Sequence, residues 1–224
     1  MEFSVAGRLE NGSIIAEVTA PEADETTQYA YYLYEKNQGV LEKRMYTGER
    51  TCSFQPPSSG QYYVRAFVRS WPDGLQKDPV TVAKNSNTVT YYLRKSIPYE
   101  RLRAERFRST ESTIYDILWN GVHFEFFIHN KPESTRAVIL GTGDVGGAKF
   151  RPHFDRISWA AELPGTAIYY FDPTVYLGES TLGWGYGTND RWYLEDMAFL
   201  LYTILTKLGI SAENTLFYGS SAGG

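Results

Sequence analysis

The sequence predicts a two-domain protein in which an all-β sandwich precedes an α/β domain. A chain of 224 residues suits two units of about 100 residues each. The first part consists of short alternating segments separated by turn residues, whereas the second alternates apolar strand-like runs with helical periodicity. The predicted boundaries are 1–94 for the sandwich, 95–112 for a basic linker and 113–224 for the α/β domain.

The composition excludes several classes of function. The 22 Lys and Arg and 26 Asp and Glu residues give a net charge of -4, which argues against a general nucleic-acid binder. No apolar run approaches the roughly 20 residues that cross a bilayer, so we predict no membrane span. The single cysteine, Cys52, forms no internal disulfide, and residues 1–12 do not resemble a signal peptide. These features predict a cytoplasmic protein.

The first predicted domain contains strand-like runs, which lie at 13–19, 28–35, 51–54, 62–69 and 88–93. The clearest of them begins with Gly60, Tyr62 and Val64, and its alternate residues face one side. This Gly-x-Tyr-x-Val start resembles the tyrosine corner of immunoglobulin-like and fibronectin-like sandwiches. The resemblance implies a phenol that bonds back to the preceding corner, and it implies no particular ligand.

Two stretches of the first half allow either ligand contact or a structural role. One stretch contains four tyrosines, Tyr29, Tyr31, Tyr32 and Tyr34. Their rings would suit stacking on sugar rings; alternatively, two of them fill the core while the other two cover the sheet. The linker 95–112 is locally basic, which suits an anionic partner. Mixed charges between domains are, however, more typical of a solvated connection.

The second predicted domain opens with a hairpin. Two β-prone runs, 114–119 and 122–129, flank Asn120-Gly121, and both of these residues tolerate the positive φ of a type I′ turn. Three buried strands are predicted after the hairpin, at 136–140, 166–171 and 214–218. A helix is predicted at 157–163.

The strongest helix signal lies at 194–208, where apolar residues recur at three- and four-residue spacing. The segment Thr188-Asn189-Asp190 provides candidate amino-terminal caps. Gly209 is placed to end the helix.

A GxSxG motif follows the last predicted strand, and it reads Gly219-Ser220-Ser221-Ala222-Gly223. In such a motif a sharp turn presents the central hydroxyl above a sheet, and only small residues fit around it. Ser221 is therefore the predicted nucleophile, and Gly219 and Gly223 are the glycines of the turn. Ala222 is the predicted donor of a backbone N–H to an oxyanion.

With its hairpin, Gly-rich loop and serine turn, the segment 113–224 resembles the first half of an α/β-hydrolase domain. The resemblance implies a second oxyanion N–H from Thr142 or Gly143. The sandwich and the text FYGSSAGG are also loosely similar to bacterial acetyltransferase-like proteins of surface polysaccharide and accessory secretion. Both likenesses imply a serine esterase or acyltransferase for a small-molecule or glycan ester, with no cofactor and no metal.

The position of the serine departs from that family. There the acid and the histidine follow the serine in the chain, but only three residues follow Ser221. We interpret the histidines that precede it, His123, His129 and His153, as structural. The sequence thus predicts the amino-terminal part of a longer enzyme, inactive without its acid and base. It also predicts an exposed apolar edge at 214–218 and association of the chain.

Two other functions remain open. The segment Gly141-Thr142-Gly143-Asp144-Val145-Gly146 matches the GxGxxG of dinucleotide-binding domains, and Asp172 ends the next strand. Pro152, however, would interrupt the helix that has to follow such a motif. The second alternative is a non-catalytic glycan-binding protein, in which the sandwich holds the glycan and the hydrolase-like part is a scaffold.

Overall fold

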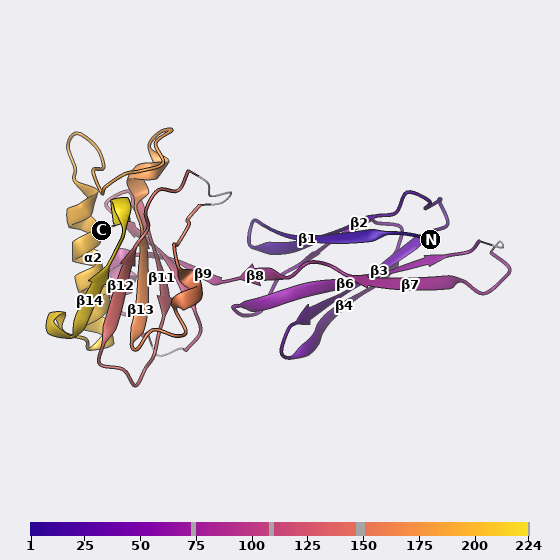
Figure 1. The fold of residues 1–224 in the computed structure, drawn as a ribbon, viewed down its shortest axis with the longest axis horizontal. Helices are drawn as coiled ribbons and strands as arrows, with labels where there is room; N and C mark the ends of the chain where they lie inside the picture. Colours follow the sequence, from indigo (N-terminus) through magenta and orange to yellow (C-terminus); the bar gives the residue numbers. More distant parts are fainter. Residues whose placement is uncertain (73–74, 108–109, 147–150, 224) are drawn as a thin grey trace. The chain divides into compact units, whose positions relative to one another are not determined.

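The structure is a computed structural model that describes all residues except 73–74, 108–109, 147–150 and 224 (Figure 1). It divides into two compact units, Met1–Tyr92 and Leu93–Gly224, which are described separately. Within the described residues, strands β1 to β14 form three sheets, and α-helix is confined to two segments.

The first unit is built from two antiparallel sheets. One joins β1-β2-β5 in order, and the other joins β4-β3-β6-β7, with β8 paired to β6. The strands are β1 Ser4–Glu10, β2 Ser13–Thr19, β3 Gln28–Glu35, β4 Gly39–Thr47, β5 Thr51–Phe54, β6 Gly60–Ser70, β7 Val80–Asn85 and β8 Val89–Tyr91.

Alternate side chains of both sheets form the core of the first unit. Ile14 of β2 and Val64 of β6 are fully buried in it. The Tyr62 hydroxyl donates to the Ser58 carbonyl oxygen at 2.7 Å, which is the tyrosine-corner hydrogen bond that the sequence predicts. Within β3, Tyr29 and Tyr31 are buried. Tyr32 and Tyr34 are half-buried, and each packs against a neighbouring aromatic ring.

The second unit contains one mixed sheet, in the order β14-β12-β13-β11-β10-β9. Its strands are β9 Leu93–Pro98, β10 Thr113–Trp119, β11 Val122–His129, β12 Ala137–Gly141, β13 Thr166–Phe171 and β14 Thr215–Tyr218. β12 runs parallel to both β13 and β14, and β9 runs parallel to β10. The β10–β11 and β11–β13 pairs are antiparallel.

Two local predictions in this unit are confirmed. Asn120 and Gly121 have φ values of 47° and 80°, as the predicted hairpin turn requires. The helix α2, Tyr193–Leu208, ends at Gly209 with a left-handed φ of 72°. The predicted caps at 188–190 are wrong, because the helix begins after Trp192, which makes no side-chain cap hydrogen bond.

Both faces of the second sheet are covered. Leu200 and Ile204 of α2 pack with Phe126 and Ile139 of the sheet, so the helix covers one face (Figure 1). On the other face, rings from β11, β13 and the β12–β13 connection meet within 6.5 Å between centroids: Phe127, Phe154, Tyr169 and Phe171.

The predicted fold class, an immunoglobulin-like sandwich followed by half of an α/β-hydrolase sheet, is wrong. The chain is mostly β, and the described residues lack the strand–helix alternation that this class requires. The helix expected at 157–163 is only a 3-10 turn, Ile157–Trp159. Arg156 before it has a left-handed φ of 58°, and Pro164 follows too soon for a stable helix. The helix α1, Tyr99–Leu102, is a single turn.

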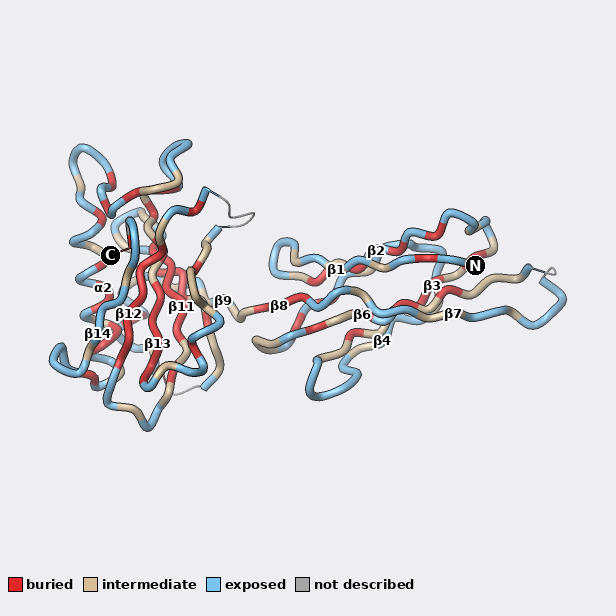
Figure 2. The backbone as a smooth tube through the Cα atoms, in the orientation of Figure 1, coloured by how far each residue is buried: buried red, intermediate tan, exposed pale blue. Residues whose placement is uncertain are grey.

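Two further segments differ in position from the expectation. The segment expected as a linker, 95–112, contributes most of β9 and all of α1 to the second unit. β14 is the edge strand of its sheet, and it is exposed where β12 beside it is buried (Figure 2).

Candidate functional site

The candidate site lies where three parallel strands end side by side. β12 ends at Gly141, β13 at Phe171 and β14 at Tyr218, and β12 pairs with both of the others. The predicted site residues follow two of these strands. Thr142 and Gly143 come directly after β12, and the GxSxG segment comes directly after β14. The sheet therefore brings together two loops that are far apart in the sequence.

Ser221 adopts an uncommon backbone conformation in this turn. Its φ is 53°, in the left-handed region that non-glycine residues rarely occupy. It begins a 3-10 turn, Ser221–Gly223, in which the Gly223 N–H donates to the Ser220 carbonyl oxygen at 3.0 Å. The residue is exposed. A strained, exposed serine at the end of a parallel strand is typical of a functional position.

The glycines hold the two loops at close range. A Cβ on Gly223 would lie 2.6 Å from the Gly141 carbonyl oxygen, and a Cβ on Gly141 would lie 2.4 Å from the Gly223 carbonyl oxygen. No larger residue fits at either position without a shift of the backbone. A Cβ on Gly143 would lie 4.0 Å from the Ser221 Cβ, so the loop after β12 faces the serine turn. Gly219 joins β14 to that turn.

The predicted oxyanion donors differ in what they contact. The Gly143 N–H already donates to Asp155 Oδ2 at 2.9 Å, so this donor is not free in the structure. The Thr142 hydroxyl donates to the His153 carbonyl oxygen at 2.9 Å, which ties the loop after β12 to the segment around Asp155. Ala222 lies in the serine turn, and its side chain is outside the described part of the chain.

Arg156 is a site residue that sequence reasoning missed. Its Nη2 donates to the Ser220 hydroxyl at 2.8 Å, directly beside Ser221 in the chain. Its guanidinium carbon lies 5.5 Å from the ring centroids of both Trp159 and Tyr218. The sequence places Arg156 far from the GxSxG segment, so only the fold reveals this contact.

The three histidines contact different partners. His123 Nδ1 lies 2.7 Å from Asp116 Oδ1, and His129 Nδ1 lies 2.8 Å from the Ser112 hydroxyl. Burial, followed by the nearby Lys131, lowers the pKa of His129. His153 Nε2 lies 3.1 Å from Asp155 Oδ1, so His153 is the histidine that shares a partner with the Gly143 loop.

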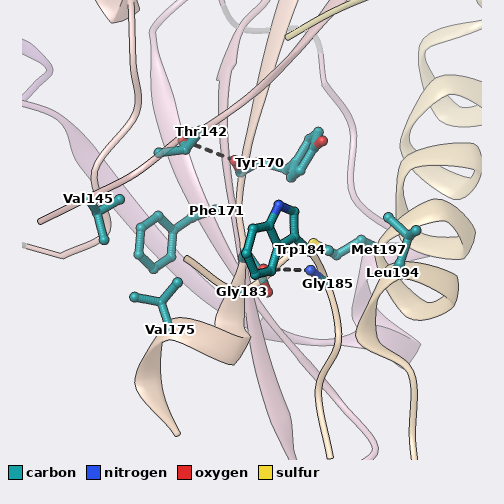
Figure 3. A pocket seen from close by; sticks show the side chains of 12 residues that line it. Thr142, Val145, Tyr170, Phe171, Val175, Gly183, Trp184, Gly185, Leu194 and Met197 are labelled. Atoms are coloured by element: carbon teal, nitrogen blue, oxygen red, sulfur yellow. Dashed lines mark hydrogen bonds between the residues drawn. The ribbon is translucent and has the colours of Figure 1, made fainter. Parts of the chain in front are cut away.

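A cavity of about 100 Å³ opens beside Thr142 and Gly143. Figure 3 shows side chains that line it, Thr142 among them. Its apolar lining comes from the ends of β12 and β13, from the turn after β13 and from α2, and it includes Phe171, Val175, Trp184, Leu194 and Met197. At the edge of this lining, Asp172 accepts hydrogen bonds from the N–H groups of Thr174 and Gly185. Its carboxylate therefore holds the polypeptide that forms one wall.

The GxGxxG segment is engaged by carboxylates. The Gly146 N–H donates to Asp144 Oδ1 at 2.8 Å, and the Gly143 N–H donates to Asp155. Hydrogen bonds from the Thr181 side chain and from Gly146 lower the pKa of Asp144, which keeps it charged. A pyrophosphate would meet two negative groups where a dinucleotide site offers free N–H donors. Residues 147–150, where the helix of that motif would start, lie outside the described residues.

Within the described residues, no three His, Cys, Asp or Glu side chains are grouped as metal ligands. None of the described helices has the length and apolar character needed to cross a membrane. The chain matches no protein-family model, and a comparison with curated proteins finds no significant match.

Proposed function

We propose that Ser221 is the nucleophile of an acyl-ester hydrolase or acyltransferase that acts on a small-molecule or glycan ester. The observation that carries the proposal is the conformation of Ser221. It is an exposed hydroxyl residue with a φ of 53°, in a turn that packs glycine against glycine at the end of a parallel strand. Such strain is maintained only where the surrounding structure enforces it.

The proposed reaction has two steps. The Ser221 Oγ attacks the ester carbonyl carbon, the ester C–O bond breaks, and the alcohol leaves with a proton while the acyl group stays on Oγ. Water or an acceptor hydroxyl then attacks the acyl group and frees the serine. Negative charge on the carbonyl oxygen would be stabilised by the Ala222 N–H and by an N–H of the Thr142–Gly143 loop. For Gly143 this requires Asp155 to move away.

The cavity beside Gly143 would receive the acyl group. Its volume of about 100 Å³ is small compared with the roughly 300–1,000 Å³ of ordinary ligand pockets. Apolar side chains line most of it, and its polar groups are largely committed to the wall. A short acyl chain fits this small volume better than a long one.

A general base must take the Ser221 proton. We propose that the three histidines of this chain have structural roles, because His123 and His129 bond side chains of other segments. His153 bonds Asp155, which in turn holds the Gly143 loop. An external base should then accelerate the reaction of Ser221.

Labelling by a fluorophosphonate probe tests the nucleophile. In this reaction the serine Oγ–P bond forms, the P–F bond breaks, and fluoride and a proton leave. We expect slow labelling of the full chain, accelerated about tenfold by about 0.1 M imidazole, well within what a general base contributes. Ser221→Ala should abolish labelling, and Ser220→Ala is the matched control that should retain it.

Three outcomes would remove parts of this proposal. Labelling that persists in Ser221→Ala would exclude Ser221 as the nucleophile and assign the reaction to another residue, whereas a full chain that is not labelled even with imidazole would favour the non-catalytic alternative. Rapid labelling without imidazole that is lost in His153→Gln would instead identify His153 as the base.

A further inference from the structure

We propose that Arg156 binds an anionic group, a carboxylate or a phosphate, on the ester that Ser221 attacks. This inference rests on the proposed function of Ser221, but it concerns a separate group of residues and a separate interaction. It assigns a charged substrate class to a site whose cavity has both apolar and polar lining.

The first observation is the position of the guanidinium. Arg156 Nη2 donates to the Ser220 hydroxyl at 2.8 Å, and Ser220 immediately precedes Ser221. An anion bound by Arg156 would therefore lie within a few ångströms of the serine turn. The contact places a positive charge beside the reacting ester without using the Ser221 hydroxyl.

The second observation is that two rings hold the guanidinium. Its central carbon lies 5.5 Å from the centroid of Trp159 and 5.5 Å from the centroid of Tyr218. The two ring centroids are 6.0 Å apart, with 52° between their planes. Arginine packed on aromatic faces keeps its planar fork of N–H donors for a carboxylate or phosphate. The rings therefore fix the orientation of the cation and reduce the entropy lost on binding.

The third observation is that the backbone of Arg156 is held in an uncommon conformation. Its φ is 58°, and its carbonyl oxygen accepts hydrogen bonds from the Tyr169 hydroxyl at 2.9 Å and from the Trp159 N–H at 2.8 Å. Tyr169 belongs to β13 and is 1% exposed, so the anchor is part of the core. Strain held by a buried partner is typical of a residue with a binding role.

The fourth observation is that no acid neutralises this cation within the described residues. The neighbouring Asp155 directs one carboxylate oxygen to His153 Nε2 and the other to the Gly143 N–H. Arg156 is half-buried, and Ser220 engages only one of the five N–H donors of a guanidinium. A carboxylate or phosphate on the substrate would supply the missing charge and a bidentate acceptor.

The binding test uses the full chain with Ser221→Ala, so that no turnover occurs. Calorimetric titration compares acetoxyacetate, an acetyl ester with a carboxylate on its alcohol part, with methyl acetoxyacetate, its neutral counterpart. We expect the charged ester to bind about tenfold more tightly, a difference of about 1.4 kcal/mol. A parallel titration with inorganic phosphate separates a carboxylate preference from a phosphate preference.

Variants of Arg156 then assign the difference to this residue. Arg156→Met should remove the preference for the charged ester, and Arg156→Lys should retain part of it, because the charge remains but the planar fork is lost. Arg136→Met is the matched control, since Arg136 is exposed at the opposite end of β12. A thermal melt of each variant shows whether it is folded. If Arg156→Met does not fold, Arg156→Lys still provides the test.

The outcomes separate this proposal from that for Ser221. The role of Arg156 would be overturned if the charged and neutral esters bind with equal affinity and inorganic phosphate does not bind. An unchanged preference in folded Arg156→Met would do the same. A charge preference that depends on Arg156 would support the anion site even if the probe fails to label Ser221.

Discussion

Gly141, the last residue of β12, packs directly against the serine turn. A Cβ built there meets the Gly223 carbonyl oxygen at 2.4 Å and the Tyr170 hydroxyl at 2.5 Å. Burial, with a contribution from Asp172, raises the pKa of Tyr170, so this phenol stays neutral. The serine turn therefore depends on a glycine that lies about 80 positions earlier in the chain.

Gly141→Ala should destabilise the second unit by about 1–3 kcal/mol, because the added methyl forces two backbone segments apart. It should also slow labelling of Ser221, whose turn contains Gly223. Urea unfolding and probe labelling measure the two effects. Gly178→Ala is the control, since its Cβ would meet nothing within 4 Å. Equal stability of the two variants would contradict the close packing described here.

His129 should make stability depend on pH. Burial first and Lys131 second lower its pKa, whereas the unfolded chain protonates this residue near its ordinary value of about 6.5. The folded state therefore favours neutral imidazole. Its contribution to stability is present above about pH 6.5 and is lost as the pH falls from there through the lowered pKa.

The His129→Gln variant isolates this contribution. The wild type should lose more stability than the variant between about pH 7.5 and 5.5, measured as the change in Tm. Glutamine keeps a polar group for Ser112 but does not titrate. Parallel pH profiles for the two proteins would show that His129 does not titrate with folding.

The sequence identifies some residues of the candidate site but not others. The spacing of Gly219, Ser221 and Gly223 identifies a candidate turn because all the residues concerned are local. Arg156 is not identifiable in this way, since its contact with Ser220 spans 64 positions and depends on Trp159 and Tyr218. Likewise, only the fold reveals that Asp155 engages the N–H of Gly143.

Among the elements, those with strong local signals could be predicted. The run 166–171 is β13, and the period of apolar residues at 194–208 matches α2 apart from its first residue. The segment 157–163 was not predictable in the same way. A left-handed residue before it and a proline after it leave too few residues for a helix, and Trp159 is turned outward at 44% exposure.

The edge strand β14 is open to association. It pairs only with β12 among the described strands, and Leu216 and Phe217 are 61% and 64% exposed. An apolar strand with an unpaired edge is a template for another chain. The exposed edge that the sequence predicts at 214–218 is thus confirmed, whereas association itself stays a prediction.

Leu216→Lys should reduce association of the 224-residue chain, because a charge on an edge strand opposes pairing. Sedimentation velocity over a range of concentrations measures this. Leu177→Lys is the matched control, since Leu177 is 55% exposed but lies outside the strands. A wild-type chain that sediments as a monomer at every concentration would contradict the prediction.

At the scale of the whole molecule, the sequence indicates where the chain divides into two units. It does not indicate how the second unit is built. The structure divides at Tyr92, close to the end of the predicted first domain at residue 94. The predicted alternation of strands and helices is wrong, because local periodicity does not record which strands pair in the sheet. That β9 joins the sheet depends on its pairing with β10, a contact between distant residues that no local pattern records.

The central claim is that Ser221 is the nucleophile, and locating the probe by mass spectrometry tests it most directly. Trypsin cleaves after Lys207, and no Lys or Arg follows, so residues 208–224 form one peptide. Fragment ions of this peptide, from protein labelled in the presence of imidazole, should place the phosphonate on Ser221. A phosphonate on Ser220, or in any other peptide with this one unmodified, would contradict the claim.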